Sequence, residues 1–451
     1  MPITPNAAYA AAYNANAPRF RAESDSATIQ NAINAAAAAS GKRRAVVIPR
    51  ANARTGGDVW NIEKTLLLPN EITIFLDGCH LRLADGVYEN IFRNVNMYAD
   101  GYQKPENEQH GIRIVGLGDA TLDGGLDNGL REQLWTEDKP LPQTGCLILF
   151  SHVRDYEIRD IKCRRMRYWA IDQIGCRNGR LSGIDFDFVE RHPNQDGINF
   201  RVGCHHITVE DITGVTGDDV IALSAFPCGL DKRFLPEGWA PDIHDIRVSR
   251  VHATTVATIV ALRATDGAKI YNIDIEDIVD TGNAVTKPWG AVRLGENNWY
   301  RHRPAQMGEM DNIRVRGVRA FGKGTVYLAA ALSNAHISDI YAAGNTLYAV
   351  STYQGAQTFW ETGNTILPGV SLKNVLIENV RYEGKSIYRE HPEDRYTELT
   401  FPGEKFGGCA LDFRCLRDTD TMENVTLRHI HARADAPLLL AREGCGLFVE
   451  E

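Results

Sequence analysis

A short phrase recurs along this chain, and its spacing is the strongest constraint on the fold. In each copy isoleucine or valine alternates with polar residues, as in "NGRLSGIDF", "HHITVEDIT", "IYNIDIEDI" and "LKNVLIENV". A shorter apolar strand precedes each phrase. These strands open at Trp169, Asp196, Asp219, Thr258, Gly290, Thr325 and Tyr348, so the successive intervals are 27, 23, 39, 32, 35 and 23 residues. Apolar residues at every second position predict strands, and self-similarity at such a period predicts a solenoid.

The fold that best explains this repeat is all-β, a right-handed parallel β-helix in which the shortest interval, 23 residues, is one coil. The longer intervals then contain insertions, and matching strands of neighbouring coils lie about 4.8 Å apart. Little helix pattern separates the strands, which disfavours leucine-rich repeats and βαβ units. A β-sandwich of many short strands is the alternative, but a sandwich does not require a repeated phrase.

One short helix is expected near the N-terminus, at about 26–40, where Ser26 is a candidate cap and Gly41 a candidate stop. The stretches "AVVIP", "LLLP" and "EITIFLDG" follow it as predicted strands. A helix in this place suits a lid over the first strands, because an exposed strand edge invites pairing with another chain. We therefore expect a single β-helix domain over 1–451, with a cap region at 1–60 and coils with long loops at 61–451.

Bulk composition argues against several classes of partner. The chain has 451 residues and a net charge of −9, which disfavours a broad nucleic-acid-binding surface. No apolar run approaches 18 residues, so no membrane span is expected. The nine cysteines contain no C-x-x-C pair and indicate free, mostly buried thiols in a reducing compartment. Residues 1–20 show no signal-peptide pattern, which predicts a cytoplasmic protein unless a signal has been removed.

Five insertions interrupt the repeat, at 226–245, 281–289, 296–310, 352–369 and 384–408. They are expected to recur between the same two types of strand, to emerge along one side and to wall a groove. Long loops in compact domains are usually functional. Their aromatic residues can stack on sugar rings or simply pack the loops onto the body of the protein. These residues are Trp239, Trp299, Tyr300, Phe359 and Trp360.

Three aspartates form the candidate catalytic cluster. Asp196 and Asp219 are 23 residues apart, one predicted coil, and Asp218 directly precedes Asp219 after the bend at Gly217. Stacked carboxylates raise each other's pKa, which costs stability unless the site uses it. Hydrolysis of a glycosidic bond requires such a group, with one acid to protonate the leaving oxygen and one carboxylate to activate water. Two other interpretations are turn residues and a calcium site.

The stretch from "YWAIDQIGC" through "HPNQDGINF" to "GVTGDDVIALSA" resembles the polygalacturonases, glycoside hydrolase family 28. The match is specific over about 165–225, where a tryptophan rung, N-x-D-G and G-D-D follow in the family's order. The resemblance implies a right-handed parallel β-helix that hydrolyses α-linked pectic polymers with inversion and without a cofactor or metal. It implies that Asp218 is the general acid, and that Asp196 and Asp219 hold and activate the water.

The sequence departs from this family at two positions. The family's G-H-G would place a histidine at about Ala257, and its R-I-K would place a lysine at Gly295 beside the retained Arg293. In the family that lysine binds the galacturonate carboxylate, so a neutral or differently decorated pectic sugar is possible. Arg263 could replace the lost charge through a two-point grip, or it could face solvent, as could Arg293.

The remaining candidates for substrate binding lie near these arginines. They are Trp169, Glu296, Asn297 and Trp299. Trp169 suits either the core or a subsite wall, at the opening of the rung before Asp196. His205 and His206 fall at the turn of the repeated phrase and are expected to be structural. Cys176 and Cys204 occupy equivalent coil positions and are expected to stack without forming a redox pair.

The sequence favours an inverting glycoside hydrolase with a carbohydrate substrate, and neither nucleic acid nor membrane as partner. Two alternatives remain open. One is another β-helix enzyme, such as a polysaccharide lyase, an epimerase or a fructotransferase. The other is a non-catalytic glycan-binding β-helix, to which the missing histidine and lysine lend weight. The sugar, the linkage and the oligomeric state are not specified by the sequence.

Overall fold

The computed structural model describes residues 7–39, 44–126, 145–187, 194–227, 229–280, 282, 290–295, 303–322, 324–352, 370–385, 408–413, 419–441, 447 and 449–450. The chain divides into two compact units. Unit 1 contains Met1–Asp218 and Cys228–Trp239, and unit 2 contains Asp219–Pro227 and Ala240–Glu451. One of the peptide bonds that join the units therefore lies between Asp218 and Asp219.

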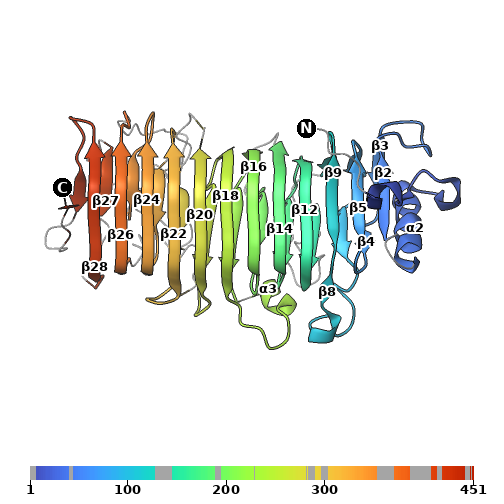
Figure 1. Cartoon of the computed structure of the whole chain (residues 1–451), viewed down its shortest axis with the longest axis horizontal. Coiled ribbons are helices and arrows are strands. Elements are labelled where there is room, and N and C mark those ends of the chain that lie inside the picture. The colour runs from blue at the N-terminus through green and yellow to red at the C-terminus, as the bar shows by residue number, and fades with distance from the viewer. Residues whose placement is uncertain are drawn as a thin grey trace. The chain divides into compact units, whose positions relative to one another are not determined.

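Unit 1 is built from parallel strands in two sheets. The long-strand sheet has the order β2–β5–β9–β12–β14–β16, and a second row, β3–β6–β10, also joins β12. The short-strand sheet has the order β4–β7–β11–β13–β15. Figure 1 shows the long strands side by side from β2 in blue to β16 in green. The bounds are β1 (Tyr13–Asn14), β2 (Ala45–Pro49), β3 (Val59–Ile62), β4 (Leu66–Leu68), β5 (Thr73–Asp77), β6 (His80–Leu83), β7 (Phe92–Asn94), β8 (Gln109–His110), β9 (Arg113–Leu117), β10 (Thr121–Asp123), β11 (Ile148–Ser151), β12 (Val153–Arg164), β13 (Ile171–Ile174), β14 (Arg177–Asp187), β15 (Ile198–Phe200) and β16 (His205–Thr216).

Unit 2 repeats the same plan with a more regular set of strands. Its long-strand sheet has the parallel order β18–β20–β22–β24–β26–β28–β30, and Figure 1 shows β18 to β28 side by side. Its short-strand sheet runs β17–β19–β21–β23–β25–β27–β29. The bounds are β17 (Ile221–Ala225), β18 (Ile243–Thr255), β19 (Val260–Ala264), β20 (Ile270–Asp280), β21 (Gly290–Leu294), β22 (Met310–Ala320), β23 (Gly324–Leu328), β24 (Leu332–Ala342), β25 (Tyr348–Ser351), β26 (Leu372–Tyr382), β27 (Cys409–Phe413), β28 (Met422–Ala432), β29 (Leu439–Ala441) and β30 (Val449–Glu450).

Each long strand covers two sides of a coil, because it bends at residues in the left-handed region of the backbone. In β12, residues 157–159 pair with β9 and residues 162–164 pair with β10. Asp160, between the two halves, has a φ of 56°, and Gly183 at the stacked position of β14 has a φ of 63°. Aspartate and glycine tolerate this conformation better than most residues. A coil therefore has three sides, one short strand and the two halves of a long one.

These parallel ladders confirm the predicted right-handed parallel β-helix. A β-sandwich is excluded, because its sheets are antiparallel. The core of unit 2 lies between its sheets and is formed by branched residues that are register partners. Examples are the buried pairs Ile273 with Ile313 and Ile275 with Val315. The single domain expected over 1–451 stays a prediction.

A ladder of asparagines stabilises one bend of unit 2. Asn334, Asn374 and Asn424 stack on successive coils, each with a φ between 52° and 54°. The side-chain amide of Asn374 donates to Asn334 Oδ1 at 3.0 Å, and that of Asn424 donates to Asn374 Oδ1 at 3.0 Å. Side chain and backbone conformation thus favour the same residue type at this position.

Replacing Asn374 with alanine should lower the free energy of unfolding by about 1–2 kcal/mol through left-handed strain alone, with a further loss from the ladder bonds. Asn374→Gly removes the same hydrogen bonds without the strain, and we expect it to be the more stable of the two variants. Urea unfolding of both variants measures the difference. Equal stability of the two variants would show that the positive φ does not determine which residue is favoured at position 374.

The N-terminal helix is confirmed, with a correction at its start. Helix α2 (Asp25–Ala38) is capped by Ser24, whose hydroxyl accepts the N–H of Ala27 at 3.1 Å. The prediction that Ser26 is the cap is wrong, because its hydroxyl is committed to Glu63 instead. The predicted stop at Gly41 lies outside the described residues. Helix α2 packs against β2, β3 and β4, as expected of a lid. In the described part of the chain the other named helical segments are α1 (Ala7–Ala10), α3 (Gly229–Phe234) and the 3-10 turns Pro18–Phe20 and Pro105–Asn107.

The five insertions border the short strands, but not in the single way the sequence suggested. Three of them follow a short strand, namely β17, β21 and β25, whereas two precede one, namely β21 and β27. The expectation that they recur between the same two strand types is therefore wrong. Most of 281–289, 352–369 and 384–408 lies outside the described residues, as does 296–302.

The cysteines in the described part of the chain are free and buried, as predicted. Cys176 and Cys204 stack on adjacent coils, where the N–H of His205 donates to the carbonyl of Cys176 at 3.0 Å. His206 has a φ of 55° and occupies the bend, which confirms its turn role. Cys228, Cys415 and Cys445 lie outside the described residues. Among the helices that the structure describes, none has the length and hydropathy needed to span a membrane.

Candidate active site

Unit 1 places two of the three predicted catalytic aspartates on adjacent segments. The turn after β16 lies beside the segment that precedes β15. The N–H groups of Gly217 and Asp218 donate to the carbonyl oxygen of Gln195, at 3.1 and 3.3 Å. The Asp218 carboxylate in turn accepts the N–H of Asn194 at 2.8 Å. Three hydrogen bonds therefore hold Asp218 beside the segment that carries Asp196.

These two carboxylates have different surroundings. Asp196 is 4% exposed, and its Oδ2 accepts the side-chain amide of Asn199 at 3.1 Å. Asp218 is half-buried, and the hydroxyl of Thr216 donates to its backbone carbonyl at 2.6 Å, which fixes the turn. Paired acid–base chemistry uses carboxyl groups whose environments differ. Asp218 is therefore partly open to solvent, whereas Asp196 is not.

The third predicted catalytic residue belongs to unit 2. Asp219 is completely buried, its Oδ1 accepts the N–H of Thr258 at 3.0 Å, and its Oδ2 forms an ion pair with Arg263. The side chain of Arg263 is 11% exposed, so the interpretation as a solvent-facing arginine is wrong. Asp196 lies in the other unit, and its stacking with Asp219 stays a prediction.

Arg293 also lies inside unit 2 and does not face solvent. It is 3% exposed, and its Nε donates to the carbonyl of Gly295 at 3.0 Å. Gly295 has a φ of 116°, and a Cβ built there would come within 2.5 Å of the backbone of Ala329. A lysine therefore does not fit at the position where the resembling family has one. The histidine position of that family falls at Ala257, which is completely buried.

Trp169 is part of a buried aromatic and ionic group in unit 1. It is 7% exposed, packs on Tyr168 with ring centroids 4.6 Å apart, and has the guanidinium of Arg201 4.7 Å from its ring centroid. Arg201 forms an ion pair with Asp231 of α3. This cation–π contact and ion pair make Trp169 a structural element of the region that also carries Asp196. A wall for a sugar subsite remains a prediction.

The sequence interpretation missed four polar residues, of which Asn199 contacts Asp196 directly. They are Asp172, Asn199, Arg201 and Asp231, all buried in unit 1. The usable signal was the polar pair in "AIDQI", since charged residues are almost never fully buried unless they are paired or functional. Unlike Asp196 and Asp218, this pair has no neighbouring glycine and forms no motif.

The aromatic residue Trp239 of the first insertion is a packing residue. Trp239 packs its loop onto the body of unit 1, against His152 and His205, with ring centroids 5.7 and 5.1 Å away. The packing interpretation therefore holds for this tryptophan. The other aromatic and binding candidates lie outside the described residues. They are Glu296, Asn297, Trp299, Tyr300, Phe359 and Trp360.

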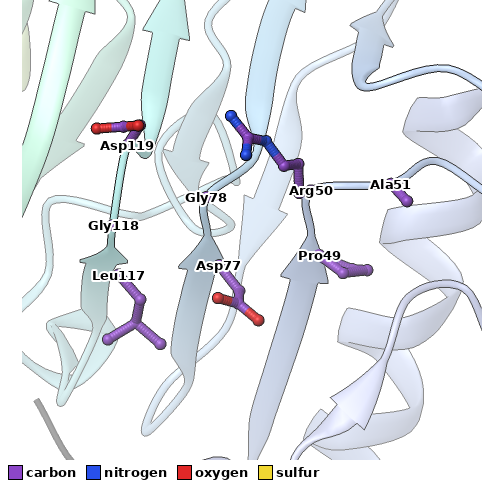
Figure 2. Close-up of a pocket in the computed structure, with 8 residues that line it drawn as sticks. All are labelled: Pro49, Arg50, Ala51, Asp77, Gly78, Leu117, Gly118 and Asp119. Atoms are coloured by element: carbon purple, nitrogen blue, oxygen red, sulfur yellow. The ribbon is translucent and has the colours of Figure 1, made fainter. Parts of the chain in front are cut away.

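A cavity of about 490 Å³ opens elsewhere in unit 1, between the stacked turns 49–51, 77–78 and 117–119 (Figure 2). Figure 2 shows the charged side chains of Arg50, Asp77 and Asp119 around it. The Tyr9 hydroxyl donates to Asp77 Oδ2 at 2.6 Å, and this hydrogen bond raises the pKa of Tyr9 to about 12. No predicted site residue lines this cavity, so it is separate from the candidate active site.

Comparisons with known proteins support the fold but do not show a family. No protein-family model matches the chain, and no curated protein is similar to it in sequence. A tailspike protein of an E. coli bacteriophage, solved with a hexasaccharide, is similar in structure with a TM-score of 0.50 and 9% identity, over 94% of this chain and 71% of that one.

Two further structures are similar at lower TM-scores. An exopolygalacturonase from Thermotoga maritima has a TM-score of 0.47 and 13% identity, over 83% of this chain and 89% of that one. The A-module of a mannuronan C-5 epimerase from Azotobacter vinelandii has a TM-score of 0.48 and 15% identity, over 95% and 96%. At these identities the likeness concerns the fold alone.

Proposed function

We propose that this protein is an inverting glycoside hydrolase that cleaves an α-linked, pectin-type oligo- or polysaccharide. The observation that carries the proposal is the pair of carboxyl groups in unit 1. Half-buried Asp218 is held beside the segment of buried Asp196 by three hydrogen bonds, two between backbone groups and one from a backbone N–H to the Asp218 carboxylate. A turn that served only to reverse the chain would not require a carboxylate at both places.

The roles follow from exposure and from the resemblance of the sequence motif. Asp218 is the general acid that protonates the leaving glycosidic oxygen. Asp196 and Asp219 hold and activate the water that attacks the anomeric carbon from the opposite face. Arg293, Arg263 and Trp169 are proposed to bind the substrate. Glu296, Asn297 and Trp299 are assigned the same role from the sequence alone. No cofactor or metal takes part in this scheme.

In this proposal, the sugar unit at the cleavage position is not an undecorated galacturonate. The family resemblance places a carboxylate-binding lysine at Gly295, where the backbone leaves no space for a side chain. The arginine that could replace its charge is already paired with Asp219. A neutral or decorated pectic sugar at the cleavage position requires no such cation. Glycan binding without catalysis is the second candidate function, since this ion pair engages a carboxylate that hydrolysis needs.

A screen for new reducing ends on pectic, rhamnogalacturonan and other plant oligosaccharides tests the proposal. We expect release from at least one α-linked pectic substrate, with no product that absorbs as an unsaturated uronate. Unsaturated product that disappears with a chelator would favour a lyase instead. Sugar binding measured by calorimetry, with no turnover on any substrate, would support the binding function and contradict the hydrolase.

A further inference from the structure

Asp172 lies in the middle of β13, on the face of the short-strand sheet that α3 covers. Its register neighbours are Leu149 in β11 and Asn199 in β15. Leu149 packs against Phe234 of α3, which identifies this face as the one beneath the helix. Asp172 is completely buried, and neither of its carboxyl oxygens has a hydrogen-bond partner among the residues that the structure describes.

Asn199 links this position to the candidate active site. It is 1% exposed, and its amide nitrogen donates to Asp196 Oδ2 at 3.1 Å. Its other amide atom, Oδ1, has no hydrogen-bond partner within the described part of the chain. Register partners on parallel strands lie about 4.8 Å apart and point to the same face. An amide oxygen and a carboxyl group, both without partners, are therefore neighbours.

The groups that face Asp172 come from several elements. Burial raises the pKa of Asp172 to about 8, the positive charge of Arg201 opposes this shift, and the negative charge of Asp231 reinforces it. The N–H of Gln173 also acts against the shift, although it is outside hydrogen-bonding geometry. The other nearby titratable groups are uncharged at neutral pH, since burial raises the pKa of each. They are Tyr98, Cys146 and Tyr168.

A proton explains the absence of partners, among the described residues, at the Asp172 carboxyl group and at Asn199 Oδ1 better than a bound cation does. A cation such as calcium needs six or more oxygen ligands around one point. The carboxylates of Asp172, Asp196 and Asp231 are not grouped within 4.8 Å of one another, and the guanidinium of Arg201 already supplies a positive charge. A carboxylate and an amide oxygen are both acceptors, and one proton converts the carboxyl group into a donor.

We propose that protonated Asp172 donates a hydrogen bond to Asn199 Oδ1 and thereby holds the Asn199 amide so that its nitrogen donates to Asp196. Asp172 is then a positioning residue. This inference rests on the proposed function, which gives Asp196 its catalytic role. Loss of the proton reverses the arrangement. An ionised Asp172 attracts the amide nitrogen, so the amide turns and presents its oxygen to Asp196.

Infrared spectroscopy of the full chain tests the protonation directly. We expect a protonated carboxyl band at pH 7 that disappears as the pH rises through about 8 and that is absent from Asp172→Asn. The folded chain holds this proton up to a pKa of about 8, whereas in the unfolded chain the carboxyl group returns to the ordinary aspartate pKa of 3.8. Wild-type stability should therefore fall relative to Asp172→Asn as the pH rises from 4 to 8. Identical spectra of the two proteins from pH 6 to pH 10 would overturn the proposal.

The pH–rate profile on a hydrolysed oligosaccharide tests the coupling to Asp196. Asp172→Asn keeps a donor for Asn199 Oδ1, so its kcat should stay near wild type while the inflection that Asp172 causes near pH 8 disappears. Asp172→Leu has no donor, and we expect about a tenfold lower kcat, the rate equivalent of one lost hydrogen bond, with the acidic limb shifted upward.

A matched control separates positioning from stability. Leu149→Ala changes the adjacent position of the same row and removes buried apolar volume, so it should lower Tm without moving either limb. An unchanged profile in Asp172→Leu would overturn the proposal. If no oligosaccharide is hydrolysed, the proposed function fails, but the infrared result and a carbon-13 titration of Asp196 in wild type and Asp172→Leu still decide whether Asp172 acts on Asp196.

Discussion

Asp218→Asn should lower kcat by about 10²–10⁴-fold, the contribution of a general acid, while leaving sugar binding intact. The amide cannot deliver a proton to the leaving oxygen at neutral pH. Its oxygen can still accept the N–H of Asn194, which the Asp218 carboxylate accepts at 2.8 Å, so the turn should keep its shape. Initial rates and calorimetric binding on the same oligosaccharide measure the two effects separately.

A control with the same chemical change is available on the surface of unit 2. Asp274 is a strand residue whose side chain is 57% exposed, with Arg314 at 4.0 Å. Asp274→Asn removes one negative charge from a residue that has no role in the proposed site, and it should leave kcat unchanged. Full activity in Asp218→Asn would contradict the role of this residue as the acid.

Arg263→Ala should lower the free energy of unfolding by about 3–5 kcal/mol, as expected when one partner of a buried ion pair is removed. Asp219 is completely buried, and the variant removes the guanidinium that pairs with its Oδ2. The N–H of Thr258 would be its remaining contact among those described above. Urea unfolding at neutral pH measures the loss.

Two comparison variants make this result specific. Arg247, whose side chain is 58% exposed, pairs with Glu276 at 3.5 Å, and Arg247→Ala should cost only about 0–1 kcal/mol. The double variant Asp219→Asn, Arg263→Met removes both charges and should recover part of the loss. If Arg263→Ala is no less stable than Arg247→Ala, the Asp219 pair does not stabilise the fold.

The repeat was sufficient to predict the architecture. Strand register in a β-helix follows directly from the period, so the alignment of Cys176 with Cys204 could be predicted from the sequence. The bend at His206 was equally visible, since one polar turn position recurs in every phrase. Helix α2 was placed within two residues at each end, and its cap was missed because Ser24 and Ser26 are both acceptable capping residues.

The contacts of the candidate site were harder to predict, for two physical reasons. The short strands are buried on both faces, as the four buried residues of β13 show, so alternation does not tell which side Asp172 occupies. The pairing of Arg263 with Asp219 depends on the register between β17 and β19, in which Ser224 pairs with Arg263. A long insertion separates these two strands in the sequence. Neither contact follows from a motif.

The stereochemistry of the first product tests the hydrolase proposal most directly. Proton NMR under single-turnover conditions with the best substrate shows which anomer of the product forms before mutarotation. A single water activated opposite the acid Asp218 inverts the anomeric centre, so we expect a β-anomer from an α-linked substrate. An α-anomer as the first product would contradict the mechanism, and an unsaturated uronate would contradict the hydrolase itself.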